Sequence, residues 1–408
     1  MKISDVLIIG GGPSGAVAAA NLAQKGFSVE VVEKLDFPRF VIGESLLPHC
    51  NAILAKNNLL DRITEQGYIL KAGAIFEKED TEKQIYHFRE NIGEPHNTTF
   101  QVKREEFDHE LLKGAASFGA NVTHGVEVTA YNQDENLVTA IDREGNTLEY
   151  KARFVLDCSG YGRVLPRLLD LEIPSKFKTR KAIFTRIKND IRPEGELGGY
   201  ITIFVHGDND AWIWVIPFAD GTTSVGVVCG DEYFEKQKLN QEDFWDYVIE
   251  GTPKAKTRFK NAEKLREVGM IEGFSSNVKT MHGKGFALAG NATEFLDPVF
   301  SSGVTLALVS GDLAADCIAR ELEGEAVDWQ VEYEDYMMQG INVFRDFVLA
   351  WYDGRLHKVF FADLKKESFT RSISSILSGY VWNEKNVFVG NSEDKIDFLI
   401  KMIDNASK

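Results

Sequence analysis

The chain has 408 residues, of which 44% are hydrophobic and 26% are charged, as in a soluble globular protein of two or three domains. Its formal net charge of -16 would repel phosphate backbones, and no Lys/Arg cluster offsets it, so nucleic acid is not an expected partner. The N-terminus enters a strand pattern without a secretory leader, and no run of about 18 apolar residues follows, so we expect no transmembrane segment and a cytoplasmic location.

A glycine-rich turn near the N-terminus is the strongest local signal. Residues 5–9 form an apolar run suited to a buried parallel strand, and residues 13–25 carry small side chains at helical spacing. The turn between them contains Gly10, Gly12 and Gly15, which permit a tight turn, an approach of backbone to a pyrophosphate, and close helix–strand packing. The N-terminus of the helix would face the phosphates.

A second strand is predicted over residues 28–32, and it ends in Glu33, about 20 residues beyond the glycines. A carboxylate at this place can accept hydrogen bonds from both ribose hydroxyls. This arrangement disfavours a 2′-phosphate and favours FAD or NAD as the dinucleotide. The sequence contains no second GxGxxG, so a dedicated NAD(P)H domain is not expected.

The next part of the chain predicts a second strand-to-turn element beside the dinucleotide. A helix is expected over residues 104–118, followed by strands at 126–131, 137–141 and 153–156. The last strand stops at the turn Asp157-Cys158-Ser159-Gly160.

A meander pattern follows, with candidate strands at 182–187, 200–205, 211–216 and 223–228. These strands predict a separate sheet suited to covering a substrate.

The last third of the chain returns to the parallel-strand pattern and then becomes helical. A strand at 285–289 leads into Gly290-Asn291-Ala292, a long helix follows residues 295–303, and the chain is mostly helical from Trp329 onward. The fold class is therefore α/β with a discontinuous dinucleotide-binding domain. We assign residues 1–75, 101–175 and 265–328 to that domain, 76–100 and 176–264 to the substrate-covering sheet, and 329–408 to a C-terminal helical region.

Four cysteines lie far apart, at Cys50, Cys158, Cys229 and Cys317, without CxxC or CxH pairing. This spacing predicts neither a zinc site nor a disulfide framework. We expect small buried thiols in a reducing compartment, and no metal.

Several motifs resemble a known family over roughly residues 1–350. The glycine turn, Gln101-Val102-Lys103-Arg104 with Phe107-Asp108, the turn at Asp157–Gly160 and the Gly290 segment resemble the FAD-dependent monooxygenases of the p-hydroxybenzoate hydroxylase fold. The resemblance implies a Rossmann-like FAD-binding domain with an inserted antiparallel sheet and a C-terminal helical region.

Further motifs are similar to those of flavin-dependent halogenases that act on phenols and pyrroles. They are Gly43-Glu44-Ser45-Leu46-Leu47-Pro48, Lys71 in Lys-Ala-Gly-Ala-Ile-Phe, Trp212-Ile213-Trp214-Val215-Ile216-Pro217, and the FxxPxxSxG pattern of Phe295, Pro298, Ser301 and Gly303. The tryptophan segment is the specific one, because two tryptophans alternating on one strand before Ile-Pro rarely arise by chance.

The resemblance implies a chemistry in which reduced FAD and oxygen give a C4a-hydroperoxide that oxidises halide. Hypohalous acid would then reach an electron-rich aromatic substrate through a short tunnel. Lys71 would stand at the far end of the tunnel, where an amine can hydrogen-bond hypohalous acid or form a haloamine. A solvated surface charge is the alternative for any single lysine, but Lys71 has apolar neighbours in sequence.

Trp212 and Trp214 should share one face of a strand, because side chains in a strand repeat every second residue. They would line a wall between flavin and substrate, or they would be ordinary aromatic residues in the core of a sheet.

The resemblance also implies the residues that bind FAD. They are Gly10, Gly12, Pro13, Ser14, Gly15, Glu33, Lys34, Arg39, Gly43, Glu44, Ser45, Arg104, Gly160, Asn291, Asp297, Ser302, Gly303 and Val304. Arg104 would reach the flavin phosphates or ribityl chain, or would be a helix N-terminal surface charge. Helix capping alone would explain Ser45. Free N–H groups at Ser301–Gly303 would hold a halide or the pyrimidine edge of the flavin.

Two residues depart from the family pattern. Asn291 replaces the usual aspartate, so FAD would be held by a neutral acceptor at that point, and Lys78 replaces a frequent tryptophan. The C-terminal region is also shorter than in most halogenases, which favours a less enclosed site for a carrier-protein-bound or bulky substrate.

We therefore expect an FAD-dependent halogenase or monooxygenase. Its partners would be a small aromatic substrate, free or carrier-protein-bound, a halide ion and a separate flavin reductase. The alternatives are an aromatic hydroxylase that needs no halide, a flavin dehydrogenase of geranylgeranyl-reductase type, and a flavin-binding protein without catalysis.

Overall fold

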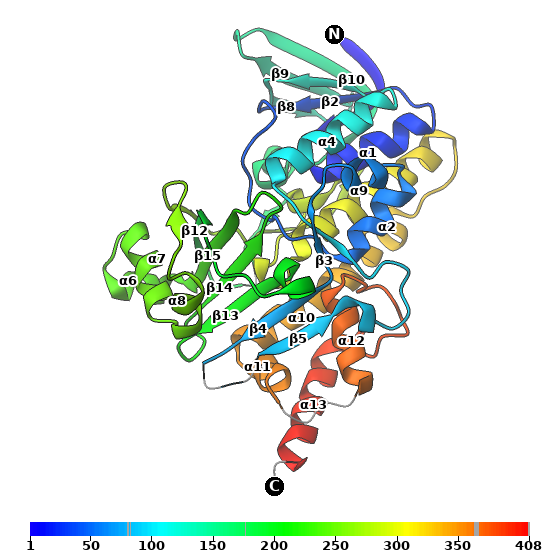
Figure 1. Cartoon of the computed structure of the whole chain (residues 1–408). Coiled ribbons are helices and arrows are strands. Elements are labelled where there is room, and N and C mark those ends of the chain that lie inside the picture. Colours follow the sequence, from blue (N-terminus) through cyan, green and yellow to red (C-terminus); the bar gives the residue numbers. More distant parts are fainter. Residues whose placement is uncertain (80, 82, 176, 363–366, 407–408) are drawn as a thin grey trace.

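The strand predicted at the N-terminus lies inside an eight-stranded, mostly parallel sheet in the computed structural model (Figure 1). The structure describes residues 1–408 apart from 80, 82, 176, 363–366 and 407–408. The strand order is β19-β20-β10-β1-β2-β7, with β9 paired to β10 and β8 paired to β9. The bounds are β1 Lys2–Ile9, β2 Val29–Glu33, β7 Asn121–His124, β8 Val126–Asn132, β9 Leu137–Asp142, β10 Thr147–Asp157, β19 His282–Gly283 and β20 Phe286–Leu288.

Close backbone contacts fix helix α1 (Pro13–Gln24) against the end of β1. Gly10 has a φ of +99°, and a Cβ added to Gly15 would lie 2.0 Å from the Gly10 carbonyl oxygen. On the other side of α1, a Cβ added to Gly311 of α9 (Ser302–Leu322) would lie 2.3 Å from the Ser14 carbonyl oxygen. Glycine at these positions therefore lets α1 pack directly on the turn and on α9.

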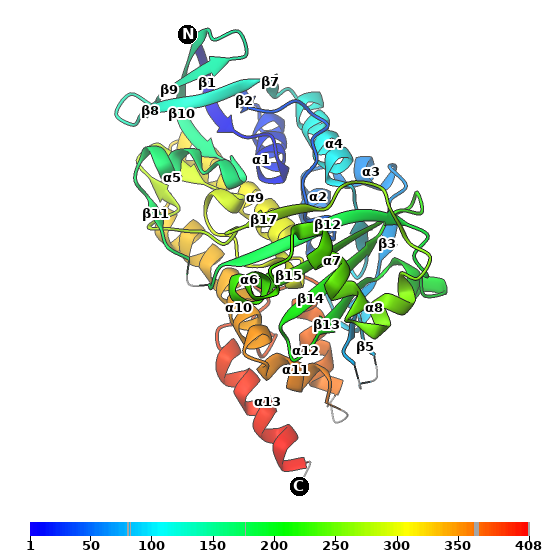
Figure 2. The same ribbon diagram turned by 90° about the vertical axis from the view of Figure 1, so that its left-hand side faces the viewer.

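The predicted meander forms a second sheet, in the order β16-β12-β15-β14-β13-β4-β5, with β17 also paired to β12. Its strands are β4 Gly73–Glu77, β5 Gln84–His87, β12 Arg180–Lys188, β13 Ile201–His206, β14 Ala211–Pro217, β15 Thr223–Gly230, β16 Glu263–Lys264 and β17 Gly269–Glu272. Viewed after a 90° turn, this sheet lies below the parallel sheet and beside the C-terminal helices (Figure 2). Two short pairs, β3 (Ile69–Lys71) with β6 (Thr99–Gln101) and β11 (Glu172–Ile173) with β18 (Asn277–Val278), complete the strands.

Both faces of the second sheet are covered, because every residue of β14 is buried. Trp212, Trp214 and Ile216 belong to the main core, whereas Ile213 and Val215 pack in a separate cluster with residues of α7. The prediction that the two tryptophans share one face is confirmed. The helices on the far side are α6 (Asp231–Gln237), α7 (Gln241–Glu250) and α8 (Pro253–Arg258).

The C-terminal part of the chain is helical, as predicted. Its elements are η6 (Gln330–Asp335), α10 (Tyr336–Tyr352), α11 (Arg355–Phe360), α12 (Glu367–Leu377) and α13 (Ser392–Ala406). Phe76 of the second sheet contacts Phe360 at a ring-centroid distance of 4.8 Å and Trp351 at 5.7 Å. Aromatic packing therefore joins α10 and α11 to the face of the sheet that carries the tryptophans.

The other helices surround the parallel sheet or connect it to the second sheet. They are α2 (Pro48–Lys56), α3 (Leu60–Thr64), α4 (Arg104–Ser117), α5 (Val164–Leu168) and the short turns η1 (Phe88–Glu90), η2 (Gly160–Gly162), η3 (Gly195–Gly199), η4 (Gly290–Ala292) and η5 (Pro298–Phe300). Helix α4 confirms the helix predicted at 104–118. All four cysteines are buried and unpaired.

Within the described residues, α9 is the one helix long and apolar enough to cross a membrane. The protein itself buries 78% of the most apolar window of α9. Helix α9 is therefore a core helix, and it packs against α1 and α2.

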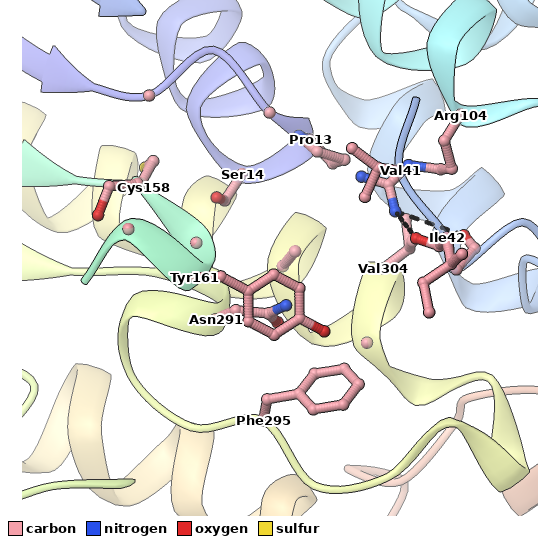
Figure 3. A pocket seen from close by; sticks show the side chains of 18 of the residues that line it. Pro13, Ser14, Val41, Ile42, Arg104, Cys158, Tyr161, Asn291, Phe295 and Val304 are labelled. Atoms are coloured by element: carbon pink, nitrogen blue, oxygen red, sulfur yellow. Dashed lines mark hydrogen bonds between the residues drawn. The ribbon is translucent and has the colours of Figure 1, made fainter. Parts of the chain in front are cut away.

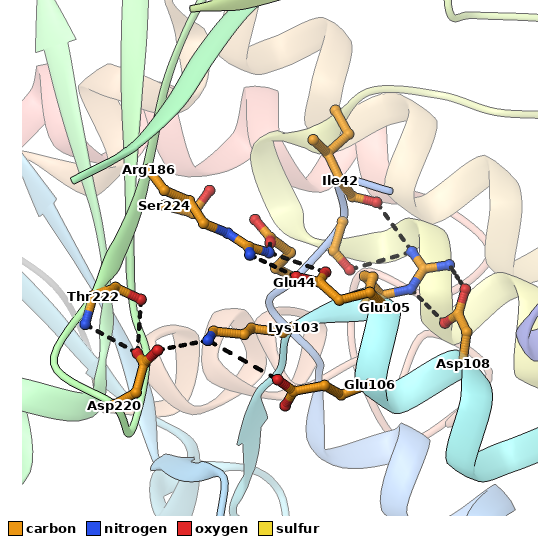
Figure 4. Close-up of polar contacts among 12 residues, drawn as sticks. Ile42, Glu44, Lys103, Glu105, Glu106, Asp108, Arg186, Asp220, Thr222 and Ser224 are labelled. Atoms are coloured by element: carbon orange, nitrogen blue, oxygen red, sulfur yellow. Dashed lines mark hydrogen bonds and ion pairs between the residues drawn. The ribbon is translucent and has the colours of Figure 1, made fainter. Parts of the chain in front are cut away.

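An ion-pair cluster joins the second sheet to the parallel-sheet part of the chain (Figure 4). Arg186 of β12 donates to Glu44 at 2.7 Å and to both oxygens of Glu105 in α4, at 2.5 and 3.0 Å. Burial raises the pKa of Glu44, and Arg186 opposes that rise. The guanidinium is therefore the main compensation for a carboxylate that is almost inaccessible to water.

Replacing Arg186 by methionine should lower the free energy of unfolding by about 3 kcal/mol, because Glu44 would then be buried without a counter-charge. Chemical denaturation of the purified protein measures the change. Arg89→Met is the matched control, since Arg89 and Glu196 form an exposed pair and its loss should leave stability nearly unchanged. Equal losses in the two variants would contradict the importance of the buried pair.

Candidate cofactor and active site

A cavity of about 590 Å³ lies between the carboxyl ends of the parallel strands and the second sheet. The Gly10–Ser14 turn, the turn after β10 and the loop before α9 surround it, and Figure 3 shows Ser14, Tyr161, Asn291 and Phe295 facing it from these segments. Ligands of open α/β sheets bind at this edge, where the strands end.

This cavity is lined by most of the residues that we expect to bind the cofactor. They are Gly10, Gly12, Pro13, Ser14, Glu33, Lys34, Arg39, Gly43, Glu44, Ser45, Arg104, Gly160, Asn291, Gly303 and Val304. Gly15, Asp297 and Ser302 are buried next to lining residues without lining the cavity themselves. The structure thus brings together residues from distant parts of the sequence, and their individual contacts with a cofactor stay predictions.

The N-terminus of α1 faces the cavity without a side-chain cap. Gly12 is the N-cap residue, Pro13 follows it, and no side chain accepts from the first-turn N–H groups. The first turn carries no acidic residue. The N–H groups of α1 and the positive end of its dipole therefore remain directed at a site suited to a pyrophosphate.

Glu33 lies at the end of β2 with its carboxylate fixed by backbone N–H groups. One oxygen accepts from Gly11 N and the other from Leu35 N, each at 2.8 Å. These bonds orient the carboxylate toward the cavity and leave lone pairs for ribose hydroxyls.

Arg104 is buried, so the alternative that it is a surface charge at the start of a helix is wrong. Its guanidinium binds Asp108 through both oxygens, at 2.7 and 2.9 Å, and donates to the Ile42 carbonyl at 3.0 Å and the Gly43 carbonyl at 3.4 Å. Arg39 also donates to Asp108, at 3.2 Å. Arg104 therefore holds the segment that covers the cavity, and its own donors are largely engaged.

Neither Glu44 nor Ser45 caps the following helix. Helix α2 begins at Pro48 and its N-cap residue is Leu47. Glu44 pairs with Arg186, and the buried Ser45 hydroxyl has no hydrogen-bond partner among the described residues. An unpartnered hydroxyl on the wall of a cavity, together with uncapped helix amides, fits a polar cofactor in this space.

Lys71 lies behind the cavity wall instead of in it. Its side chain is buried, its amine donates to the Leu46 carbonyl oxygen at 2.7 Å, and it lies 5.3 Å from the ring centre of Phe88. Burial lowers the pKa of the amine to about 7, from its ordinary value of 10.5. In the described part of the chain this is the one hydrogen bond of the amine, so N–H donors remain available for a ligand.

Trp214 lines the cavity, and Trp212 lies behind it at a ring-centroid distance of 6.1 Å. The indole N–H of Trp214 donates to Ser224 Oγ at 3.2 Å, and that of Trp212 donates to the Tyr352 hydroxyl at 2.9 Å. Both indoles are therefore buried and held by hydrogen bonds at the sheet side of the cavity.

The loop before α9 carries the last group of expected residues. Ser301 is the N-cap position of α9, with a φ of 55°, and no side chain caps this helix. Asp297 accepts from Val299 N at 3.0 Å and from the Tyr352 hydroxyl at 2.8 Å. Burial raises the pKa of Asp297 to about 6, and nearby Arg180 lowers it. Asp297 thus holds the loop from outside the cavity lining. Gly303 and Val304, in the uncapped first turn of α9, line the cavity.

Several residues that line the cavity were not predicted from the sequence. Tyr161 and Phe274 pack edge-on around Phe295, at ring-centroid distances of 5.6 and 5.8 Å. The second sheet contributes Ala182, Ile201, Ile216 and Ile271. Tyr161 directly follows the Asp157–Gly160 turn, so its place at the cavity could have been predicted from that motif. The sheet residues carry no motif, because only the packing of the two sheets brings them to the cavity.

Comparison with known proteins agrees with this geometry. Residues 3–337 match the family described as FAD binding domain. The chain is 29% identical to a Pseudomonas fluorescens chlorinase of 1H-pyrrole-2-carbonyl bound to a peptidyl-carrier protein, over 94% of this chain and 91% of that protein.

Two solved structures are similar over nearly the whole chain. A flavoprotein/dehydrogenase from Cytophaga hutchinsonii is 42% identical, with a TM-score of 0.95 over 100% of both chains. The flavin-dependent brominase Bmp2 is 26% identical, with a TM-score of 0.86 over 99% of this chain and 100% of that one.

The chain therefore belongs to the FAD binding domain family, and its cofactor is FAD. Within that family it is an FAD-dependent oxidoreductase of the flavin-dependent halogenase group. The predicted resemblance and fold class are confirmed.

Replacing Gly15 by alanine should weaken FAD binding by about tenfold or more, because the new Cβ would force α1 away from the Gly10 turn. The absorbance of the bound flavin and a titration of apoprotein with FAD measure the loss. Gly230→Ala is the matched control, since Gly230 has a φ of -73° and no atom within 4 Å of an added Cβ. Normal flavin content in the Gly15 variant would contradict the assignment of this turn.

Proposed function

We propose that this protein halogenates an electron-rich aromatic ring of phenol or pyrrole type, and that the Lys71 amine delivers the halogen. The observation that carries this proposal is the position of Lys71. Its amine is buried, holds spare N–H donors, and is separated from the cavity lining by the backbone of Leu46, the residue after lining residue Ser45.

FAD, when reduced and exposed to oxygen, supplies the oxidising equivalent that converts halide into hypohalous acid. The protein has to keep that oxidant away from water and from the organic substrate until it reaches Lys71. Trp214 and the apolar residues of the second sheet exclude water from the cavity side, and the segment Gly43–Leu46 separates the cavity from the amine.

The pKa of about 7 gives Lys71 access to both of its protonation states near neutral pH. The ammonium form donates a hydrogen bond to hypohalous acid and polarises its halogen, whereas the neutral amine attacks the halogen with loss of water. Burial is the physical cause of the lowered pKa. At the ordinary pKa of a lysine, almost no neutral amine would be present near neutral pH.

The carrier-bound pyrrole substrate of the Pseudomonas fluorescens relative supports a free or carrier-tethered aromatic ring as the substrate here. A halide ion and a separate flavin reductase complete the proposed system. Uncapped amides at the start of α9 are the proposed halide contact beside the flavin.

The proposal is tested with purified protein, FAD, a flavin reductase, NADH and bromide or chloride. A panel of phenols, pyrroles and a carrier-tethered pyrrole-2-carbonyl group is analysed by mass spectrometry. We expect halide-dependent products with the halogen isotope pattern. Hydroxylated products formed equally well without halide, or reduction of an added prenyl chain, would identify the two alternative reactions and reject the proposal.

Lys71→Ala should reduce the yield of halogenated product by about 100-fold or more, because it removes the group that presents the halogen to the ring. NADH oxidation through FAD should continue. Lys78→Ala, directly after the neighbouring strand β4, is the control and should keep normal product yield. An unchanged yield in the Lys71 variant would reject the proposed role of the amine.

Lys71→Met should stabilise the protein by about 1–2 kcal/mol at pH values near or below 7. The folded-state pKa of about 7 lies below the ordinary value of 10.5, so the unfolded chain binds the extra proton between these limits. Wild-type stability therefore rises with pH across that window, and the advantage of the variant should fade toward its upper end. Denaturation curves at several pH values measure this trend, and a pH-independent difference would contradict the shifted pKa.

A further inference from the structure

Elements from different parts of the chain meet at Tyr352, the last residue of α10. Its hydroxyl accepts from Trp212 Nε1 at 2.9 Å and lies 2.8 Å from Asp297 Oδ2. The indole N–H can only donate, so the phenol oxygen is the acceptor toward Trp212 and its hydrogen is free to bind Asp297. The result is a directed chain of hydrogen bonds from β14 through α10 to the loop before α9.

The surroundings hold this phenol in one position. The Arg180 guanidinium of β12 lies 3.3 Å from the centre of the Tyr352 ring. Asn209, in the turn between β13 and β14, donates to the Trp351 carbonyl at 3.0 Å and so fixes the end of α10. Burial raises the pKa of the Tyr352 hydroxyl well above its usual value, so the phenol stays protonated and keeps its hydrogen for Asp297.

Both partners of Tyr352 support walls of the cavity. Trp212 contacts Trp214, which lines the cavity on the sheet side. Asp297 precedes Pro298, which lines it on the α9 side, and also accepts from Val299 N. One hydroxyl therefore ties together two walls that belong to different elements.

A second link from α10 fixes the same loop. Arg345 lies two helical turns before Tyr352 and binds Glu294 at 2.6 Å, with both side chains buried. Glu294 directly precedes Phe295, another lining residue. The loop is thus anchored to α10 at two points, Glu294 and Asp297, and Tyr352 is the anchor that also reaches the second sheet.

We propose that Tyr352 is a positioning residue that sets the orientation of the Trp212–Trp214 indole pair and the place of the Pro298 loop across the cavity. This inference rests on the proposed function where it concerns halogen transfer. Without the hydroxyl, Trp212 N–H and Asp297 would lose their shared partner, and the indole wall would be free to shift. Oxidant would then be lost before it reaches the substrate.

The test uses Tyr352→Phe, which removes the hydroxyl and keeps the ring under Arg180. Tyr336→Phe in the same helix is the matched control, because Tyr336 is 41% exposed and lies away from the cavity lining. Near-ultraviolet circular dichroism of the apoprotein reports the indole environment. FAD titration and the amount of halogenated product per NADH oxidised report the cavity and its coupling.

We expect Tyr352→Phe to change the indole dichroism and to lower product per NADH by about tenfold, with NADH oxidation retained. Trp212→Phe and the double variant complete a mutant cycle. If the hydroxyl acts through Trp212, adding Tyr352→Phe to Trp212→Phe should have little further effect on coupling.

Additive losses in the cycle, or a Tyr352→Phe protein with wild-type dichroism and coupling, would overturn the inference. Uniform loss of stability in both tyrosine variants would mark the hydroxyl as merely structural and would also overturn it. Should the wild-type protein form no halogenated product from any substrate, the proposed function fails, whereas the dichroism and FAD titration still decide the role of Tyr352.

Discussion

The site depends on a thin partition, the extended segment of residues 42–46 between the cavity and Lys71. Arg104 holds the Ile42 and Gly43 carbonyls, and Arg186 holds the Glu44 side chain. Val102 N donates to the Glu44 carbonyl and Leu46 N donates to the Phe100 carbonyl, which ties the same segment to β6 and the residue after it. The Leu46 carbonyl in turn accepts from Lys71, so hydrogen bonds along both edges hold this segment between the cavity and the amine.

The position of this partition explains why polar residues that line the cavity, such as Glu44 and Arg104, also form ion pairs with other protein residues. The buried Arg104 pairs with Asp108 of its own helix α4. The partly buried Arg186 of β12 pairs with Glu44 and with Glu105 of α4, which belong to other elements. Pairs of this kind contribute little net stability, but they fix the positions of the groups that they join. Through Ile42, Gly43 and Glu44, the two cations hold the segment that lies between the cavity and Lys71.

Much of this site could be predicted from the sequence, and the reason differs from residue to residue. Local backbone geometry determines the roles of Gly10, Gly15 and Glu33, so their spacing in the sequence was enough to predict their places at the site. Lys71 and the tryptophans needed the resemblance to a family, because a buried amine and a pair of indoles have no local signature. The partners of Arg104 and Glu44 are set by tertiary contacts, and Tyr352 lies in a helix whose sequence carries no motif.

Burial moves the pKa values of Lys71 and Asp297 toward neutrality from opposite sides, to about 7 and about 6. Both groups therefore carry a cost at neutral pH that an apolar residue would avoid. At Lys71 the cost yields an amine that populates both protonation states near neutral pH, as the proposed halogen transfer requires. At Asp297 the cost is offset by structure, because the carboxylate accepts hydrogen bonds from Val299 N and the Tyr352 hydroxyl and so holds the loop before α9. Neither group lines the cavity: Lys71 lies against Leu46, next to the lining residue Ser45, and Asp297 directly precedes the lining residue Pro298. On the proposed function, both costs are therefore borne directly behind the cavity wall.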